Sequence, residues 1–314
     1  MSGTAGSSGF VTTLEGLGRL FRLIPVLSWT GGGFLIGTAV SLRFHGGRGD
    51  WTALALALLA GLLIQGFIAH AYNDYEDWRS GTDRVSPGVL SGGSGVIPLK
   101  KLREGALPLI GLVTAGLVIL IGVYLIYRVG PLMGVFLLVG LWAGIGYSSP
   151  PLRMAYRPFL GEWAVAFPAV VACVLAPGYL IGYSLPGSLW LAAVTHGLFC
   201  LGWLMQHHLA DREADLGANP PKITTVVKIG QLYGAQATRW VAAGYYGIII
   251  PWAVGLGYGV DPVYFGSAAL ALSAALLGLA TNPDNIRQIT VHEVAMIALT
   301  MVNAGWLAGY LRVS

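Results

Sequence analysis

The sequence predicts an all-α integral membrane protein, a bundle of nine transmembrane helices. Of the 314 residues, 55% are hydrophobic and 10% are charged, and the mean hydropathy is +0.69. Soluble domains carry about 25% charged residues, so charges this few cannot cover a soluble domain of this size. The second observation is a series of nine apolar runs, each close to the roughly 20 residues that cross a bilayer as a helix.

The apolar runs follow one another along nearly the whole chain. They predict spans at residues 20–42, 51–73, 105–127, 130–148, 160–183, 187–209, 233–258, 263–281 and 291–311. Most connections are short, but the cytoplasmic loops 74–104 and 210–232 are long and hold most of the acidic residues. We therefore expect a single nine-helix transmembrane domain over residues 19–314. A short disordered cytoplasmic tail, residues 1–18, is expected before it.

The distribution of Lys and Arg sets the expected orientation, because cytoplasmic loops carry an excess of these residues. With a cytoplasmic N-terminus, four of the 18 Lys and Arg side chains lie outside, namely Arg43, Arg48, Arg128 and Arg312. The other fourteen are cytoplasmic. This ratio predicts a multi-pass protein of the cell (inner) membrane with both long acidic loops at the cytoplasmic face.

Acidic side chains gather at the end of the second predicted span. At 100° per residue, one stripe about 100° wide on a helix holds four polar side chains, which are His70, Asn73, Asp74 and Asp77. Glu76 lies off this stripe. The pattern predicts that the carboxylates of Asp74 and Asp77 face the same neighbour.

The sixth predicted span ends in a similar pattern. Asp211 and Asp215 are four residues apart and share a helix face with His207, whereas Glu213 points nearly opposite. Acids at a helix C-terminus cost about 0.3–1 kcal/mol each, and like charges on one face repel further. A cation is therefore expected to compensate both clusters.

Magnesium is the expected cation, because it prefers hard oxygen ligands and bridges one or two carboxylates to substrate phosphates. Gly81 is expected to end the helix of the second span, which leaves Asp83 in the loop. The candidate Mg²⁺ ligands are Asp74, Asp77, Asp83, Asp211 and Asp215, and all of them except Asp83 are candidate catalytic residues. A plainer interpretation is that they are ordinary polar residues of the membrane interface.

A diphosphate bound to such a metal would also need hydrogen-bonding and positively charged partners. The candidates for substrate binding are Asn73, Arg79, Tyr147, Arg157 and Lys222. Arg79 and Lys222 are close to the acidic clusters in sequence, and Arg157 lies in the loop after the fourth span. The alternative for the basic residues is the general cytoplasmic excess of positive charge, and for Tyr147 it is the aromatic belt of the membrane interface.

These residues resemble the motifs of the UbiA superfamily of intramembrane prenyltransferases, which has nine spans and two Asp-rich motifs after helices 2 and 6. The ubiquinone branch usually reads Asn-Asp-x-x-Asp-x-x-x-Asp, whereas here the ninth position is Gly81 and the third acid is Asp83. This form is similar to the menaquinone branch, the 1,4-dihydroxy-2-naphthoate polyprenyltransferases. Other similar features are Ser91–Ile97, Tyr147 with Pro151 and Tyr156, Gly161-Glu162 and Lys222-x-Thr224.

The chain departs from the menaquinone branch next to the acids. The second motif reads His207-His208-Leu209-Ala210-Asp211 where that branch usually has Asn-Asn-x-Arg-Asp, and His70 stands where it usually has Asn. His70 and His207 each lie one turn before an acid of their stripe, so they could contact an acceptor head group. Alternatively, they hold the aspartates in place.

The resemblance implies Mg²⁺-dependent transfer of a prenyl group from an isoprenyl diphosphate to an acceptor. The implied acceptor is an aromatic quinone precursor such as 1,4-dihydroxy-2-naphthoate. 4-Hydroxybenzoate, another phenol and a lipid alcohol are alternatives. The expected partners are these substrates and membrane lipid, without nucleic acid or an obligate protein partner. A transporter is a less favoured alternative, because the acids lie at span ends and not at the bilayer midplane.

Overall fold

The computed structural model describes residues 4–45, 49–88 and 90–311, and all the regular structure in these ranges is helical. Arg48 and Arg312, which were counted in the distribution of Lys and Arg, lie outside the described residues. So do the first three residues of the expected tail. The α-helices are α1 (Thr4–Phe21), α2 (Leu23–Val26), α3 (Gly32–His45), α4 (Trp51–Leu63), α5 (His70–Ser80), α6 (Thr82–Val85), α7 (Ala106–Val129), α8 (Leu132–Gly146), α9 (Phe167–Gly182), α10 (Gly187–Gly217), α11 (Thr225–Tyr233), α12 (Arg239–Gly259), α13 (Val263–Ala280) and α14 (Ile286–Tyr310). Three π-helical segments, η1 (Leu27–Gly31), η2 (Ile64–Ala69) and η4 (Gly161–Ala166), and two 3-10 turns, η3 (Met154–Tyr156) and η5 (Ala235–Thr238), join them.

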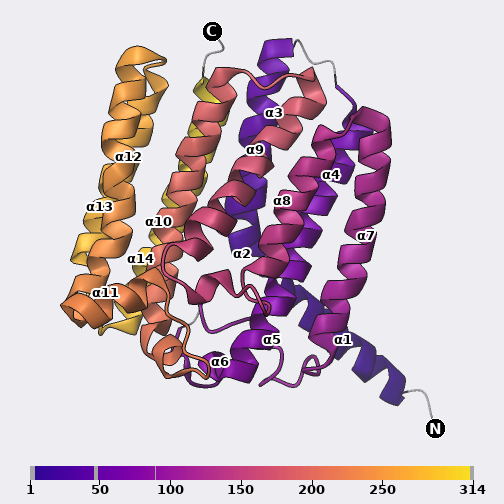
Figure 1. The fold of residues 1–314 in the computed structure, drawn as a ribbon, viewed down its shortest axis with the longest axis vertical. Coiled ribbons are helices and arrows are strands. Elements are labelled where there is room, and N and C mark those ends of the chain that lie inside the picture. Colours follow the sequence, from indigo (N-terminus) through magenta and orange to yellow (C-terminus); the bar gives the residue numbers. More distant parts are fainter. Residues whose placement is uncertain (1–3, 46–48, 89, 312–314) are drawn as a thin grey trace.

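Eight helical segments in the described ranges are long and apolar enough to cross a membrane. They are Leu23–His45, Trp51–Ser80, Ala106–Val129, Gly161–Gly182, Gly187–Gly217, Ala235–Gly259, Val263–Ala280 and Ile286–Tyr310. The remaining predicted span, residues 130–148, contains α8, which is apolar but has 15 residues. At 1.5 Å per residue α8 is about 22 Å long, shorter than the roughly 30 Å hydrocarbon core. It packs against α7, α9 and η2 (Figure 1).

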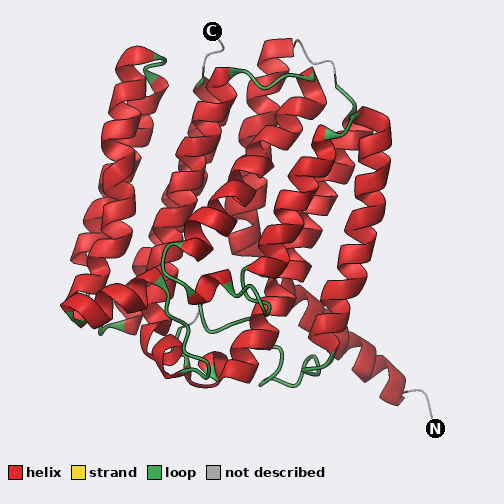
Figure 2. Ribbon diagram, viewed as in Figure 1, coloured by secondary structure: helices red, strands yellow, loops and turns green. Residues whose placement is uncertain are grey.

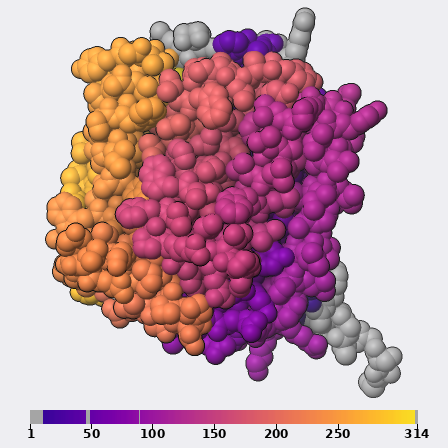
Figure 3. Space-filling view, in the orientation of Figure 1, coloured from indigo at the N-terminus to yellow at the C-terminus, as the bar shows by residue number. Residues whose placement is uncertain are grey.

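The segments run side by side as one bundle, with α10 among them as the most buried (Figure 1). Exposed apolar side chains cover the flanking helix α7, which suits a surface that faces lipid. In the space-filling view α7 forms one side of the molecule and α12 with α13 the other (Figure 3). The longer loops gather at a single end of the bundle (Figure 2), where α5, α6 and α11 also lie.

The two long loops are shorter than predicted. The helix of the second span continues to Ser80 and is followed by the single turn α6, and α10 continues to Gly217. The predicted loop 210–232 is therefore reduced to residues 218–224 before α11. Side chains from neighbouring segments satisfy the acids at these helix ends, as described below, so the helices can extend past them.

The N-terminal residues also differ from the prediction of a disordered tail at 1–18, because α1 is helical from Thr4. Leu17 and Leu20 pack with Ala71, Leu102 and other side chains of α5 and the following loop. Glu15 makes ion pairs with Arg19, at 3.2 Å, and with Lys101, at 2.7 Å. These contacts dock the C-terminal half of α1 under the bundle, which Ser- and Gly-rich composition alone could not indicate.

Small residues let α3 and α9 pack closely, as is common between helices in a membrane. A Cβ atom at Gly37 would lie 2.1 Å from the carbonyl oxygen of Val174, and one at Gly33 would lie 2.8 Å from the Cβ of Cys173. Both distances are shorter than atoms tolerate. The two glycines therefore set the separation of α3 and α9, which form part of the wall of the cavity described next.

We expect Gly37→Ala to destabilise the protein, because the added methyl group must push α3 and α9 apart. Thermal unfolding in detergent measures the effect. Gly244→Ala in α12 is the matched control, since nothing lies within 4 Å of its added Cβ and Ala favours a helix by about 0.5–1 kcal/mol over Gly. Equal melting temperatures for the two variants would contradict this account of the packing.

Candidate functional site

The first acidic cluster lies where the second span leaves the bundle. α5 ends at Ser80, and Gly81 adopts a left-handed conformation with φ 99°, with its N–H donating to the carbonyl of Asp77 at 3.1 Å. The predicted helix end at Gly81 is confirmed. Asp83 lies in the short helix α6 and not in an irregular loop.

The loop after α6 packs directly against these carboxylates. The Oδ2 atom of Asp74 accepts hydrogen bonds from the backbone N–H of Ser94, at 3.1 Å, and from its hydroxyl. Gly93 has φ 71°, and a Cβ there would lie 2.2 Å from Asp83 Oδ2 and 3.4 Å from Asp74 Oδ1. Only a glycine backbone can therefore come this close to both acids.

Asn73, a candidate for substrate binding, holds Asp77 in place. Its amide nitrogen donates to Asp77 Oδ2 at 3.0 Å, and its amide oxygen accepts from the hydroxyl of Ser148 at 2.9 Å. The amide thereby links α5 to the chain after α8 and fixes the rotamer of Asp77.

The second acidic cluster meets the first across the same loop. Asp211 Oδ1 accepts hydrogen bonds from the hydroxyls of Ser91, at 2.8 Å, and Ser86. Serines of this loop thus donate hydrogen bonds to both clusters, because Ser86 and Ser91 bind Asp211 and Ser94 binds Asp74. The predicted meeting of the two helix ends is therefore seen in the structure, and serines join them.

Lys222 is the cation between the clusters. Its Nζ atom donates to Asp77 Oδ2 at 2.8 Å and lies 3.7 Å from Asp215 Oδ1. The side chain is buried, and the backbone N–H of Lys222 donates to the carbonyl of Asp215 at 2.8 Å. Burial alone would lower the pKa of Lys222, but the carboxylates of Asp215 and Asp77 outweigh it and hold that pKa well above its usual value.

The donor set fits a divalent cation. Within the described residues, buried oxygens without a hydrogen-bond partner remain on Asp74, Asp77, Asp83 and Asp215. Burial and the neighbouring carboxylates of Asp77 and Asp74 raise the pKa of Asp83 to about 9. Within these described residues, no group of three or more His, Cys, Asp or Glu side chains is arranged to hold a metal ion without other ligands. These carboxylates would therefore hold Mg²⁺ together with water and phosphate oxygens, as Mg²⁺ sites usually do.

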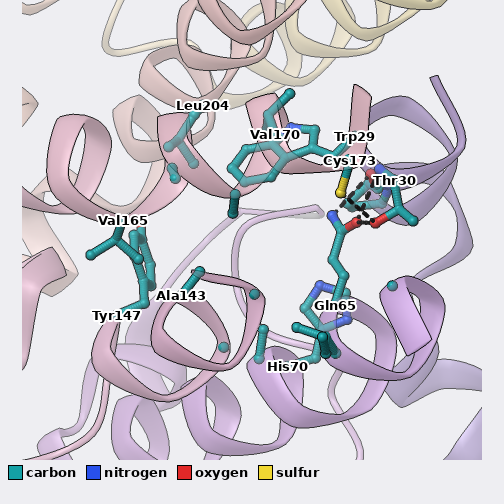
Figure 4. Close-up of a pocket in the computed structure, with 18 of the residues that line it drawn as sticks. Trp29, Thr30, Gln65, His70, Ala143, Tyr147, Val165, Val170, Cys173 and Leu204 are labelled. Carbon is teal, nitrogen blue, oxygen red and sulfur yellow. Dashed lines mark hydrogen bonds between the residues drawn. The ribbon is translucent and has the colours of Figure 1, made fainter. Parts of the chain in front are cut away.

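A cavity of about 200 Å³ opens from the acidic clusters into the bundle. Asp77, Asp211 and Lys222 line its polar end, and apolar residues line the remainder, among them Phe34, Ala57, Ile64, Met133, Phe136 and Ala176. Figure 4 shows Tyr147 and Val165 on one side of the cavity and Trp29 with Thr30 on the other. Such a cavity could hold a polar head group at one end and a hydrocarbon chain beyond it.

A small polar group interrupts the apolar wall where two π-helical segments meet. The side-chain oxygen of Gln65, on η2, accepts a hydrogen bond from the hydroxyl of Thr30, on η1, at 2.6 Å (Figure 4). The amide nitrogen of Gln65 donates to the carbonyl of Pro25 at 3.2 Å. The contact fixes the separation of the two spans beside the cavity.

Two of the predicted substrate-binding residues do not reach this cavity. Arg79 is exposed and donates to the hydroxyl of Tyr75 at 2.9 Å. Arg157 is also exposed. Arg153 turns inward instead and pairs with the buried Glu76 at 2.8 Å. Glu76 is thus off the acid stripe as predicted, but it is a buried ion-pair partner and not a free surface acid.

Tyr147 and the histidines of the two acidic motifs belong to the cavity wall or contact it. Tyr147, His70 and His207 all line the cavity. The hydroxyl of Tyr147 is 3.0 Å from Nε2 of His208, and Nδ1 of His70 is 3.1 Å from the carbonyl of Leu20. Among the described residues, neither His70 nor His207 forms a hydrogen bond with an aspartate. The interpretation that they hold the aspartates in place is therefore not supported by the contacts seen.

Sequence reasoning missed several residues of the site. Arg22 lines the cavity and donates to the carbonyl of Leu90, but in sequence it looks like one more cytoplasmic cation. Trp29 and Trp203 line the middle of the cavity. In the sequence, each is only a tryptophan within a predicted span, and such a residue usually serves in packing.

Comparison with known proteins gives a family and a fold. The sequence model of the UbiA prenyltransferase family matches residues 34–289. None of the curated proteins matches this sequence. A structure of a UbiA homologue from Archaeoglobus fulgidus bound to GPP and Mg²⁺ is 16% identical, with a TM-score of 0.58 over 91% of this chain and 99% of that one.

The same homologue bound to DMAPP and Mg²⁺ has a TM-score of 0.59 over the same shares of the two chains, at 16% identity. A digeranylgeranylglyceryl phosphate synthase in membranes is 13% identical, with a TM-score of 0.52 over 92% of this chain and 99% of that one. At these identities the likeness is one of fold.

We expect Asp83→Asn to stabilise the metal-free protein at neutral and higher pH. The pKa of Asp83 in the folded state, about 9, exceeds the reference value of 3.8. Between these two pH values the folded state therefore binds one proton more than the unfolded state. The contribution of Asp83 to stability is therefore present at acidic pH and is lost as the pH rises towards 9. Melting curves in detergent with EDTA should fall with pH in the wild type and fall less in the variant. The matched control is Glu213→Gln, because Glu213 is 85% exposed; an unchanged slope in Asp83→Asn would refute the prediction.

Proposed function

Because the chain belongs to the UbiA prenyltransferase family, we propose that it transfers a prenyl group from an isoprenyl diphosphate to an acceptor within the membrane. The acceptor we propose is an aromatic quinone precursor such as 1,4-dihydroxy-2-naphthoate. The Gly81 and Asp83 spacing of the first motif supports this branch of the family.

The observation that carries the proposal is the meeting of the two acidic clusters at the polar end of an otherwise apolar cavity. Lys222 lies between them and lines the cavity. A prenyl diphosphate has a matching distribution of charge along its length, with a highly charged head and a hydrocarbon tail. A soluble substrate would gain little from the apolar part of such a site.

We propose that Asp74, Asp77, Asp83, Asp211 and Asp215 would hold Mg²⁺. All of them except Asp211 have a buried oxygen without a hydrogen-bond partner within the described residues. Bound there, Mg²⁺ would supply positive charge that stabilises the diphosphate as a leaving group. The UbiA homologue from Archaeoglobus fulgidus, which shares this fold, binds GPP and DMAPP together with Mg²⁺.

The protein's own residues would bind the head group and protect the reactive carbon. Lys222 would exchange its carboxylate partners for phosphate oxygens, and Arg22 also lines the cavity. Asn73 keeps Asp77 in position through the hydrogen bond at 3.0 Å. The apolar wall excludes water, which prevents hydrolysis of the allylic cation before the acceptor attacks it.

The proposal includes the orientation expected from the Lys and Arg distribution, and with it the number of spans. With the N-terminus cytoplasmic, α1 and the acid-bearing helix ends are at the cytoplasmic face of the cell membrane, and α14 ends at the other face (Figure 1). This requires an odd number of crossings. We therefore infer that α8, extended by its flanking turns, is the ninth span of a single domain over residues 19–314.

Product analysis tests the proposed function. Purified protein in lipid should be incubated with geranylgeranyl diphosphate, Mg²⁺ and a panel that contains 1,4-dihydroxy-2-naphthoate, 4-hydroxybenzoate, a simple phenol and a lipid alcohol. Mass spectrometry should detect one prenylated acceptor together with diphosphate. Excess EDTA should abolish the product, and Mg²⁺ or Mn²⁺ should restore it. Full turnover in excess EDTA would rule out the metal role.

We expect Asp211→Ala to lower turnover by at least about 100-fold, because loss of one electrostatic group that stabilises a transition state costs about 10²–10³ in rate. Glu213→Ala is the matched control on the same helix, since Glu213 is 85% exposed and points away from the cluster. Its turnover should stay within about twofold of the wild type. Equal losses in the two variants would show that the second cluster is placed wrongly.

A further inference from the structure

We propose that Glu293 and His207 form a carboxylate–imidazole pair that takes the hydroxyl proton of an aromatic acceptor during prenyl transfer. This inference rests on the proposed function and names the residues that act on its acceptor. Glu293 lies on α14, and 86 residues separate it from His207 in sequence. The acidic motifs do not contain it, so they give no indication of this role.

The geometry of the pair fixes the imidazole. Nδ1 of His207 donates to Oε1 of Glu293 at 2.7 Å, and the side chain of Glu293 is 2% exposed. A carboxylate can only accept, so Nδ1 carries the hydrogen of this bond, and in the neutral imidazole the lone pair then lies on Nε2. His207 itself lines the cavity. Glu293 therefore orients the ring and its tautomer so that the basic nitrogen is free for a ligand.

The pair lies at the level where the chemistry should occur. His207 is four residues before Asp211 on α10, which is a rise of about 6 Å along the helix. If the diphosphate lies at the aspartates and the chain lies in the apolar part of the cavity, the reacting carbon is close to the level of His207. A hydroxyl on the attacking ring can then reach the imidazole.

The walls beside His207 suit a flat ring that carries oxygen. Trp29 and Trp203 line the cavity and meet edge to face, with ring centroids 5.5 Å apart. The ring of Trp203 is 6.2 Å from that of His207. The indole N–H of each tryptophan is buried, and neither has a hydrogen-bond partner in the described part of the chain. Two free donors and one free acceptor nitrogen are the groups that would recognise a hydroxylated aromatic ring.

The proton balance of the step is complete. The bond between the prenyl carbon and the diphosphate oxygen breaks, and its electron pair leaves with the diphosphate. A ring carbon of the acceptor forms the new carbon–carbon bond while the hydroxyl proton moves to Nε2 of His207, which gives a neutral dienone. The imidazolium then returns its proton to the oxygen as the ring carbon loses its hydrogen as a proton to the diphosphate, and the aromatic ring is restored.

Three variants test the pair: Glu293→Gln, His207→Gln and, as the matched control, His292→Gln. His292 is next to Glu293 on α14, and its Nδ1 is 2.8 Å from the hydroxyl of Thr281 and not part of the pair. The acceptors should be the one found for the wild type and a series of its ring-substituted analogues with different hydroxyl pKa values. For each variant, kcat and KM for the acceptor are measured together with diphosphate release without acceptor.

We expect His207→Gln to lower kcat for prenyl transfer by about 10²–10⁴, the usual contribution of a general base, and Glu293→Gln to lower it by a smaller factor. The loss should exceed the loss in diphosphate release at least tenfold, and it should shrink for the most acidic acceptors, which ionise without a base. His292→Gln should show neither effect.

Two results would overturn the pair. One is an equal loss of transfer and of diphosphate release, which would place His207 with the diphosphate and not with the acceptor. The other is a loss independent of the hydroxyl pKa, or no loss, which would make the contact structural. Failure of the wild type to prenylate any acceptor is a different result, because it would refute the proposed function itself.

Discussion

The contact of Lys222 with Asp77 and Asp215 is the interaction on which the polar end of the cavity depends. Two helices end there with carboxylates on facing sides, where both the helix dipoles and the like charges oppose the arrangement. A buried ammonium within 2.8 Å of Asp77 and 3.7 Å of Asp215 offsets part of this repulsion. The serines of residues 86–94 satisfy other carboxylate oxygens. Charge remains uncompensated after both, and this residual charge is what a divalent cation would neutralise.

The cavity separates charge from hydrocarbon within a few helical turns. Asp211 and Lys222 line one end, and Phe34, Met133 and Phe136 line the other. Small residues of α4, α8 and α9, such as Ala57, Gly140 and Ala176, line the apolar part. In the proposed function, a substrate with a charged head and a long tail would bind in one direction only, with its reactive carbon at the border between the two regions.

The sequence was most informative where a helical period applied. Asp74 and Asp77, and likewise Asp211 and Asp215, were predicted on shared helix faces. In the structure one acid of each pair, Asp77 and Asp215, meets Lys222. Loops have no period, so the serines that donate to these acids could not be singled out. Long-range partners were equally inaccessible. Glu293 lies near the start of the last predicted span, 291–311, and nothing in the sequence indicates that its side chain is almost fully buried against His207.

Part of the site lies outside the region that the family model matches. Residues 34–289 include both acidic clusters and Lys222. Arg22 and Trp29 precede that range, Glu293 follows it, and these three lie at the cavity or pair with a residue that lines it. A comparison confined to the matched region would therefore leave out part of the cavity wall and the partner of His207. Those side chains come from the first and the last spans of the bundle.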